Sequence, residues 1–319
     1  VGAAGTALLV LLAARVAPAR KPAAASLVWI MMIAGFVLTT AVAGRQLDPY
    51  SPERLLGVTA AVCTLAFLLG SLAVAGIEGR VAASAAPMPA ATPFRVALAQ
   101  VWGEPEARHF TLFVFVAMLA YSAQDLVLEP FAGSVFGMTL GETTRLSSLQ
   151  HGGVLVGMVA IAIIGHLAGG RLEVLRALVL GGCGCAALLL VALAGAGAAA
   201  GGIPLRAAYF ALGVANGVFA AAAIAAMMQV VGRGAPGREG VRMGLFGAAQ
   251  AVAFGLGGLT GTVLLDLGRL LTESELGGYA TVFLGDAALF LAAAAMAWRI
   301  GRSGERGRRG FGPLAPAVH

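Results

Sequence analysis

Apolar stretches of about 18 residues or more recur along almost the whole chain, and this pattern constrains the fold more than any other feature. Each stretch is long enough to cross a hydrocarbon core of about 30 Å as a helix. Charged residues make up 11% of the chain, whereas a typical soluble domain carries roughly a quarter. The sequence therefore predicts an all-α membrane protein without a soluble domain of appreciable size.

The apolar stretches predict nine membrane-spanning helices, joined by polar or glycine-rich connections. They lie near residues 1–14, 26–44, 55–77, 109–130, 146–168, 174–196, 205–230, 240–265 and 277–298. The chain opens at Val1 inside an apolar run that lacks the charged flank of a signal peptide. We therefore interpret it as a fragment that has lost an N-terminal part.

Basic residues gather in alternate connections between the predicted helices. Of the 21 basic residues, 16 lie in one alternate set of connections and 5 in the other. The richer set is expected on the cytoplasmic side, which also places the C-terminus inside. Trp29, Trp102 and Trp298 each lie where a predicted helix meets that side, a position that suits an amphipathic ring. The net charge of +6 is thus interpreted as membrane topology, and nucleic acid is not an expected partner.

The longest connection, 78–108, separates three predicted helices from six. It begins with a proline-containing stretch of small residues and continues with Phe94, Leu98 and Trp102 at the spacing of an amphipathic surface helix. Three helices, a long loop and six helices are what remains of a 6+6 chain without its first three helices. We predict a major-facilitator-type helix bundle with about nine of twelve transmembrane helices. Its parts are 1–77 (end of the N-terminal half), 78–108 (cytoplasmic linker), 109–299 (C-terminal half) and 300–319 (cytoplasmic tail).

A series of polar and glycine residues in a fixed order interrupts the apolar pattern between Phe113 and Gly157. Hydrophobic composition alone does not generate such an order. The residues are Gln124, Asp125, Leu128, Glu129, Pro130, Phe131, Gly133, Val135, Phe136, Gly137, Gly141, Glu142, Thr143, Thr144, Arg145 and Leu146. This segment resembles the PucC/LhaA family of light-harvesting complex assembly proteins, a bacteriochlorophyll-delivery branch of the major facilitator superfamily.

The resemblance implies an assembly factor for photosynthetic antenna complexes, with the core antenna LH1 favoured over the peripheral antenna LH2. It implies bacteriochlorophyll as the bound or delivered pigment, and carotenoid as a second candidate. The implied partners are antenna polypeptides, the reaction centre–LH1 complex and the lipid bilayer. The implied location is the bacterial inner membrane, in its intracytoplasmic photosynthetic part.

Two other classes of function are weighed against this one. A major-facilitator small-molecule transporter predicts polar residues that converge on a central cavity between the two halves. An enzyme is not expected, because the sequence offers no set of nucleophile, base and oxyanion donor. No residue is therefore assigned a catalytic role.

Four charged residues of the family-like segment are expected to form one contact network. Asp125 and Glu129 are one turn apart and share a helix face, where two like charges disfavour each other. Glu142 and Arg145 follow closely enough to fold back, and Arg145 is the expected partner of the carboxylates. The network is interpreted as structural, with contact to a client or pigment and proton coupling as alternatives.

Histidines are candidate pigment ligands, because imidazole nitrogen is a common metal ligand. His151 stands beside Gly152 and Gly153, whose missing side chains would admit a flat ring or another helix. His166 lies about four turns further along the same face. Helix-end capping or interhelical hydrogen bonding is the alternative for both histidines.

Asp286 is predicted to lie within the last membrane helix, where a carboxylate is rare enough to be a functional hypothesis. Protonation of Asp286 is the alternative. Cys63, Cys183 and Cys185 fall inside predicted helices and are interpreted as small apolar residues. No metal site is predicted.

Overall fold

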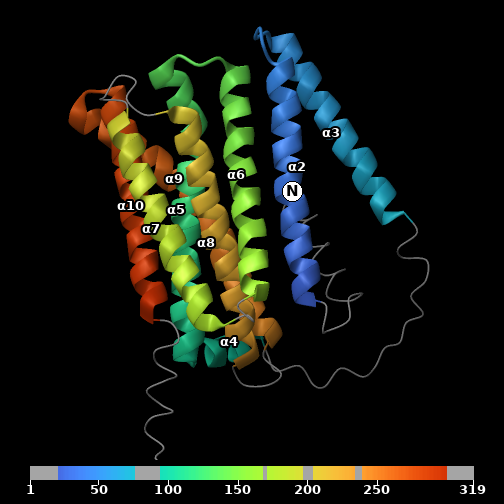
Figure 1. Ribbon diagram of the computed structural model, residues 1–319, viewed down its shortest axis with the longest axis vertical. Coiled ribbons are helices and arrows are strands. Elements are labelled where there is room, and N and C mark those ends of the chain that lie inside the picture. Colours follow the sequence, from blue (N-terminus) through green and yellow to red (C-terminus); the bar gives the residue numbers. More distant parts are fainter. Residues whose placement is uncertain (1–20, 76–93, 168–170, 197–203, 234–238, 300–319) are drawn as a thin grey trace, which may run out of the picture.

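The computed structural model describes residues 21–75, 94–167, 171–196, 204–233 and 239–299, and its regular structure in these ranges is helical. Most of the helices run side by side as a bundle (Figure 1). They are α2 (Lys21–Gln46), α3 (Pro52–Val74), α4 (Phe94–Gly103), α5 (Pro105–Phe136), α6 (Leu140–Leu167), α7 (Leu172–Ala196), α8 (Leu205–Arg233), α9 (Glu239–Thr272) and α10 (Glu275–Arg299).

Eight helices in the described ranges are long and apolar enough to cross a membrane, which confirms the predicted multi-pass helix bundle. The ninth expected span, near 1–14, lies outside the described residues, as does the tail 300–319. Several helices extend beyond the predicted apolar stretch, since α5 continues to Phe136 and α9 to Thr272. The predicted division of the chain into an N-terminal half, a linker, a C-terminal half and a tail remains a prediction.

Local sequence signals set several of the helix ends. Ser51 precedes α3, and its hydroxyl accepts a hydrogen bond from the Arg54 backbone N–H at 3.1 Å. Pro105 begins α5, where its missing N–H costs no helical bond. Gly137 ends α5 with φ 65° and ψ 24°, a left-handed conformation that a residue without Cβ adopts readily.

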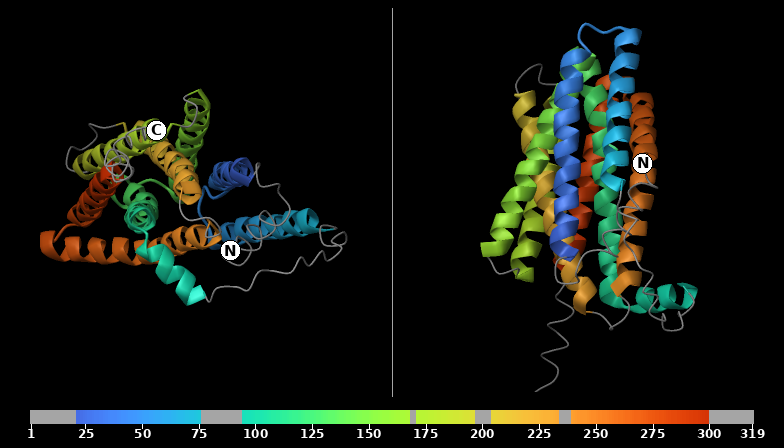
Figure 2. Two further views of the ribbon diagram at one scale, coloured as in Figure 1. Left: turned by 90° about the horizontal axis from the view of Figure 1, so that it is seen from below. Right: turned by 90° about the vertical axis from the view of Figure 1, so that its right-hand side faces the viewer.

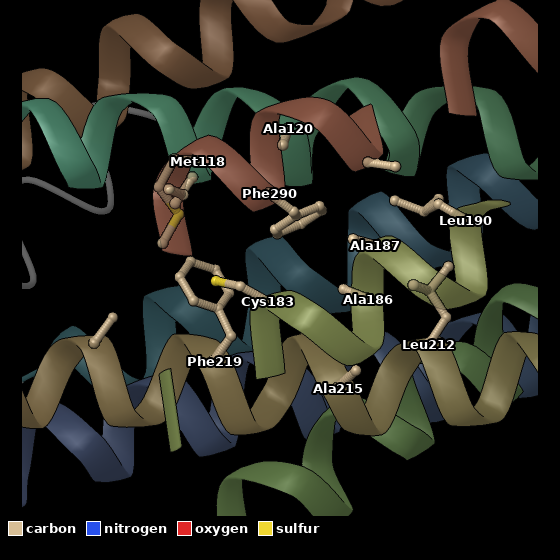
Figure 3. Packing of buried hydrophobic residues seen from close by; sticks show 14 of the residues in the cluster. Met118, Ala120, Cys183, Ala186, Ala187, Leu190, Leu212, Ala215, Phe219 and Phe290 are labelled. Atoms are coloured by element: carbon tan, nitrogen blue, oxygen red, sulfur yellow. The ribbon is translucent and has the colours of Figure 1, made fainter. Parts of the chain in front are cut away.

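The six helices α5 to α10 enclose the main hydrophobic core. Figure 3 shows Met118 of α5, Cys183 of α7, Phe219 of α8 and Phe290 of α10 pointing toward one another. The ring centroids of Phe219 and Phe290 are 5.9 Å apart. Buried rings in edge contact at this spacing pack favourably, so the interior of this bundle is closely filled.

Glycines bring α6 and α8 into close contact. A Cβ added at Gly153 or Gly157 of α6 would meet backbone atoms of α8. A Cβ added at Gly213 or Gly217 of α8 would likewise meet backbone atoms of α6. Each helix thus presents a G-x-x-x-G face to the other, the small-residue packing that membrane helices use where no hydrophobic force holds them together.

Helices α2 and α3 stand beside this bundle, with α2 against α6 and α3 leaning away (Figure 1). Ile33 of α2 packs against Val154 and Met158 of α6. By contrast, α3 has no buried residue. The pair therefore touches the rest of the described structure mainly through α2.

The bundle has two distinguishable ends. The α2–α3 and α5–α6 connections meet at one end, which we call the Asp48 end. At the other, the α4 end, α4 runs roughly perpendicular to the long helices (Figure 2), with Val101 buried and Trp102 exposed. Its predicted place along the membrane surface remains a prediction. Arg242 of α9 is fully buried there, and its Nε and Nη2 each donate to a carboxylate oxygen of Glu104 at 2.8 Å.

Candidate functional site

The family-like segment folds as the end of α5, a short turn and the start of α6. Glu142 caps that start, since the Thr139 backbone N–H donates to its Oε2 at 2.9 Å and the Glu142 N–H donates to the Thr139 hydroxyl at 3.2 Å. This reciprocal pair is a capping box. Thr143 and Thr144 donate their hydroxyls to the Leu140 carbonyl. These three residues therefore stabilise the first turn of α6.

Arg145 does not pair with the carboxylates expected from the sequence. Among the described residues its ion-pair partner is Asp48, with Nη2 and Oδ2 3.2 Å apart. The other carboxylate oxygen of Asp48 accepts from the Gly141 backbone N–H at 3.2 Å, so Asp48 also caps α6. The expected pairing was wrong because the nearest acid in space comes from a connection 97 residues away.

Close backbone contact accompanies this ion pair. A Cβ on Gly44 of α2 would lie 2.8 Å from the Arg145 side chain and 2.9 Å from the Gly141 carbonyl oxygen. A Cβ on Gly141 would collide with the Asp48 carboxylate and with the Gly44 carbonyl. Only glycine at both positions lets α2 and α6 meet at the Asp48 end in this way.

The acids Asp125 and Glu129 of α5 face separate polar groups on α6. Glu129 accepts a short hydrogen bond from the Ser147 hydroxyl. Asp125 lies one turn further into the membrane, next to Gln150 and His151, with Glu129 as a third electrostatic neighbour. The structure thus gathers these five polar side chains at the α5–α6 contact, and they form the candidate site.

His151 is held in one orientation by its own helix. Its Nδ1 lies 2.9 Å from the Ser147 carbonyl oxygen. Because a carbonyl only accepts, Nδ1 carries the proton and a neutral His151 keeps the lone pair on Nε2. The ring is half-buried and makes an edge contact with Phe36 of α2 at 5.5 Å. An imidazole fixed through Nδ1–H with Nε2 available is the arrangement that metal-binding histidines use.

The two glycines beside His151 have different surroundings. A Cβ on Gly152 would meet no atom within 4 Å, so the space next to it is open. Gly153 is buried against the backbone of α8. Of the two predicted roles for these glycines, Gly152 fits the approach of a flat ring and Gly153 serves the approach of another helix. His166 lies in α6, but its side chain is outside the described part of the structure.

Other residues of the family-like segment belong to the bundle interior. Phe131 is fully buried, and its ring centroid lies 4.9 Å from that of Phe283. Pro130 is exposed within α5, and its missing N–H leaves the Leu126 carbonyl without a helical donor. Gln124 is fully buried, and neither polar atom of its side chain has a hydrogen-bond partner among the described residues.

Asp286 lies deep in the bundle, between Phe283 and Phe290 of α10. It is fully buried, and its two carboxyl oxygens have no hydrogen-bond partner in the described ranges. Asn216 of α8 is buried in the same way. Asp286 is thus an isolated buried acid in the middle part of α10, and it does not belong to the α5–α6 site. A functional role for it remains a hypothesis.

Three residues of the region were missed from the sequence. Asp48 is a lone acid in a short connection, and nothing local says that this connection meets α6. Ser147 is one turn before His151, so helical spacing from His151 could have found it, and Gln150 is in turn three residues after Ser147. A search of the described residues finds no group of three or more histidine, cysteine or acidic side chains able to hold a metal ion.

Comparison with known proteins places this arrangement in context. A family model described as PUCC protein matches residues 1–305. The chain is 48% identical over 302 residues to a Rhodobacter capsulatus protein named Bacteriochlorophyll synthase 44.5 kDa chain, covering 93% of this chain and 68% of that protein. It is 30% identical over 315 residues to Protein PucC of Rhodobacter capsulatus, covering 94% and 65%. Against Protein PucC of Cereibacter sphaeroides it is 27% identical over 280 residues, covering 81% and 54%. The chain thus spans between about half and two thirds of the length of these relatives.

Proposed function

The chain belongs to the PUCC protein family, and from that premise we propose that it is an assembly factor for photosynthetic light-harvesting complexes. In this role it binds antenna polypeptides and delivers bacteriochlorophyll to them within the inner, intracytoplasmic membrane. LH1 is the proposed client, and the reaction centre–LH1 complex and carotenoid are further proposed partners. The α4 end faces the cytoplasm in this proposal, because the connections richer in basic residues lie there.

One observation carries the pigment part of the proposal, namely the orientation of His151. The proton on Nδ1 is engaged by the Ser147 carbonyl, which leaves Nε2 as the nitrogen able to bind the central magnesium of a chlorin. A chlorin supplies four nitrogens to its own magnesium, so a single protein ligand suffices. The residues therefore fit a pigment that is bound transiently and then delivered.

The surroundings of His151 support a flat apolar ligand. Gly152, the next residue, leaves open space where a Cβ would be, and Phe36 packs against the imidazole with the two rings nearly perpendicular. The site combines an apolar setting with few polar groups, as small-molecule sites do.

The α2–α3 pair supports the proposed binding of antenna helices. A groove of about 620 Å³ runs between α2 and α3, and small residues such as Gly57, Ala61 and Ala43 line part of it. Small residues let another membrane helix approach closely. An antenna polypeptide that spans the membrane once would present such a helix, so we propose this groove as its docking place.

The test compares two histidines that make the same local contact. His109 donates from Nδ1 to the Pro105 carbonyl at 2.6 Å, but it is exposed at the α4 end and away from the candidate site. The chain is purified gently from a phototrophic host, and its absorption spectrum and co-purified polypeptides are recorded. We expect His151→Leu to reduce the amount of co-purified bacteriochlorophyll by at least about tenfold, since loss of a metal ligand or of its supporting contacts typically lowers affinity by that factor or more. His109→Leu should retain it.

Retention of pigment by His151→Leu would remove the ligand assignment but not the client proposal. The absence of antenna polypeptides from the wild-type preparation would remove the client proposal. LH2 polypeptides in place of LH1 polypeptides would correct the choice of client.

A major-facilitator transporter is the second candidate, and one observation favours it. His151 contacts Phe36 of α2, so the polar site lies where α2 meets α6 and not wholly on an outer face. A pigment-free preparation that binds a polar solute, with the Asp125→Asn variant losing that binding, would support transport. One relative carries the name of a synthase chain, and conversion of added pigment precursor by the purified chain would instead indicate an enzyme.

A further inference from the structure

The contact between α2 and α6 changes along its length. At the Asp48 end the two backbones meet at Gly44 and Gly141. Further along, Ile33 packs against Val154 and Met158, and all three side chains are buried. Nearer the α4 end, a cavity of about 280 Å³ opens between α2, α6, α7 and α8. The interface is thus tight at one end and hollow toward the other.

Apolar side chains line this cavity throughout. Met158, Ile161 and Leu175 form a buried floor, and Trp29 and Gly165 are partly exposed at its margin. Such a lining offers water no hydrogen-bond partner. An empty space would forfeit the dispersion contacts of every lining atom. At about 30 Å³ for a group of water size, the cavity has room for roughly nine such groups, the size of a segment of hydrocarbon chain.

A basic residue stands at the α4 end of one lining helix. Arg171 directly precedes α7 and is exposed, and its carbonyl accepts a hydrogen bond from the backbone N–H of Leu175 at 3.1 Å. Its ion pair with Glu173, at 3.3 Å, leaves both side chains at least 65% exposed, so the pair is weak and does not occupy the arginine. This end of the cavity suits an anionic headgroup.

The packed residues between His151 and the cavity decide which hydrocarbon chain occupies it. Val154 and Met158 follow His151 along the same helix and close against Ile33. A pigment held at His151 therefore cannot extend its tail into the cavity without displacing this packing. A chain that enters from the surrounding leaflet meets no such obstacle.

We propose that this cavity binds one acyl chain of an anionic phospholipid from the leaflet at the α4 end, with the lipid phosphate near Arg171. The lipid fills the hollow part of the α2–α6 interface and thereby supports the contact between α2 and the bundle. This binding is independent of the pigment site at His151.

Quenching of Trp29 fluorescence by brominated lipids tests the proposal. Trp102→Phe and Trp298→Phe leave Trp29 as the single tryptophan of the full chain, so excitation at the red edge of its absorption band avoids the four tyrosines. The protein is placed in phosphatidylcholine vesicles that contain brominated phosphatidylglycerol or, at the same mole fraction, brominated phosphatidylcholine. We expect the quenching of Trp29 to give an apparent affinity about fivefold higher for phosphatidylglycerol than for phosphatidylcholine, because one basic residue near the membrane surface provides a preference of that size. Arg171→Gln should abolish this preference.

Two leucine variants separate the cavity from the general lipid surface. A Cβ at Gly165 or at Gly181 meets no atom within 4 Å, so both positions accept added bulk without collision. Gly165→Leu adds that bulk at the cavity and should remove the preferential quenching, whereas Gly181→Leu adds it at an exposed position of α7 and should not. Equal quenching by the two lipids, or an unchanged preference in Gly165→Leu, would overturn the proposal. Should the tryptophan variants fail to fold, retention of phosphatidylglycerol by the wild-type and Gly165→Leu chains in native mass spectrometry decides the same question.

Discussion

The six helices α5–α10 pack closely against one another, whereas the α2–α3 pair packs much less extensively. The bundle brings backbones together at glycines and fills its interior with aromatic rings. Helix α3 has no buried residue, although it is as apolar as its neighbours. Since lipid tails are as apolar as leucine, apolarity places a helix in the membrane but does not bind it to another helix. Shape and polar contacts do that, and the bundle has both.

The largest effect is expected from the buried ion pair at the α4 end. Arg242→Gln leaves the Glu104 carboxylate without its bidentate partner in a largely buried place, which should lower the free energy of unfolding by roughly 3–5 kcal/mol. Arg145→Gln breaks the ion pair between α6 and the α2–α3 connection, where the two side chains are 40% and 28% exposed. Solvent screening there limits the expected loss to about 1 kcal/mol or less.

Thermal unfolding in detergent, followed by the loss of soluble protein, measures both losses. Equal losses for the two variants would contradict the view that the bundle is the more firmly held region.

A second prediction replaces one glycine in each region by the same larger residue. Gly217→Leu of α8 forces a side chain against backbone atoms of Val154, and overpacking of this kind typically destabilises by about 1–3 kcal/mol. A Cβ at Gly57 of α3 meets no atom within 4 Å, and the position lines the open α2–α3 groove, so Gly57→Leu should change stability by less than about 0.5 kcal/mol.

The midpoints of denaturation in detergent compare the two variants under one condition. A large loss in Gly57→Leu would mean that α3 already has a packing partner in the folded protein. The same variant should reduce co-purified antenna polypeptide if the α2–α3 groove is their docking place.

The smallest effect is chemical and leaves the fold unchanged. Cys63 of α3 and Cys185 of α7 are exposed, whereas Cys183 of α7 is buried. A membrane-permeant maleimide should therefore modify Cys63 and Cys185 and spare Cys183, because reagent access differs. Mass spectrometry of the labelled peptides measures this. Labelling of Cys63 that is slower in native membranes than in lipid vesicles containing only the purified chain would show that a partner covers α3 before extraction.

The sequence predicted the membrane helices well, because a long apolar stretch is both the signal and the physical cause of a spanning helix. Contacts between helices were harder to predict. Glu142 was assigned to a charged network, although Thr139 three residues earlier forms the capping-box pattern that the sequence already displays. That error came from giving weight to charge over local hydrogen bonding.

Other contacts lay beyond any local pattern. Glu104 and Arg242 are 138 residues apart, and only the fold brings them together. Asp48 and Arg145 are 97 residues apart, in connections that the sequence does not relate. Of the five residues of the candidate site, the sequence therefore singled out Asp125, Glu129 and His151. It missed Ser147 and Gln150, because their role depends on how α5 and α6 assemble.

The cap that Asp48 provides for α6 also bears on the order of events during synthesis. Gly141, whose backbone N–H it binds, is made 93 residues after Asp48. At about 5–20 residues per second, the ribosome reaches Gly141 roughly 5–20 s later. The α2–α3 hairpin is thus in the membrane before its binding site on α6 exists. Its final position becomes fixed only when the α5–α6 hairpin is inserted beside it, so the order of translation sets the order in which the two regions are joined.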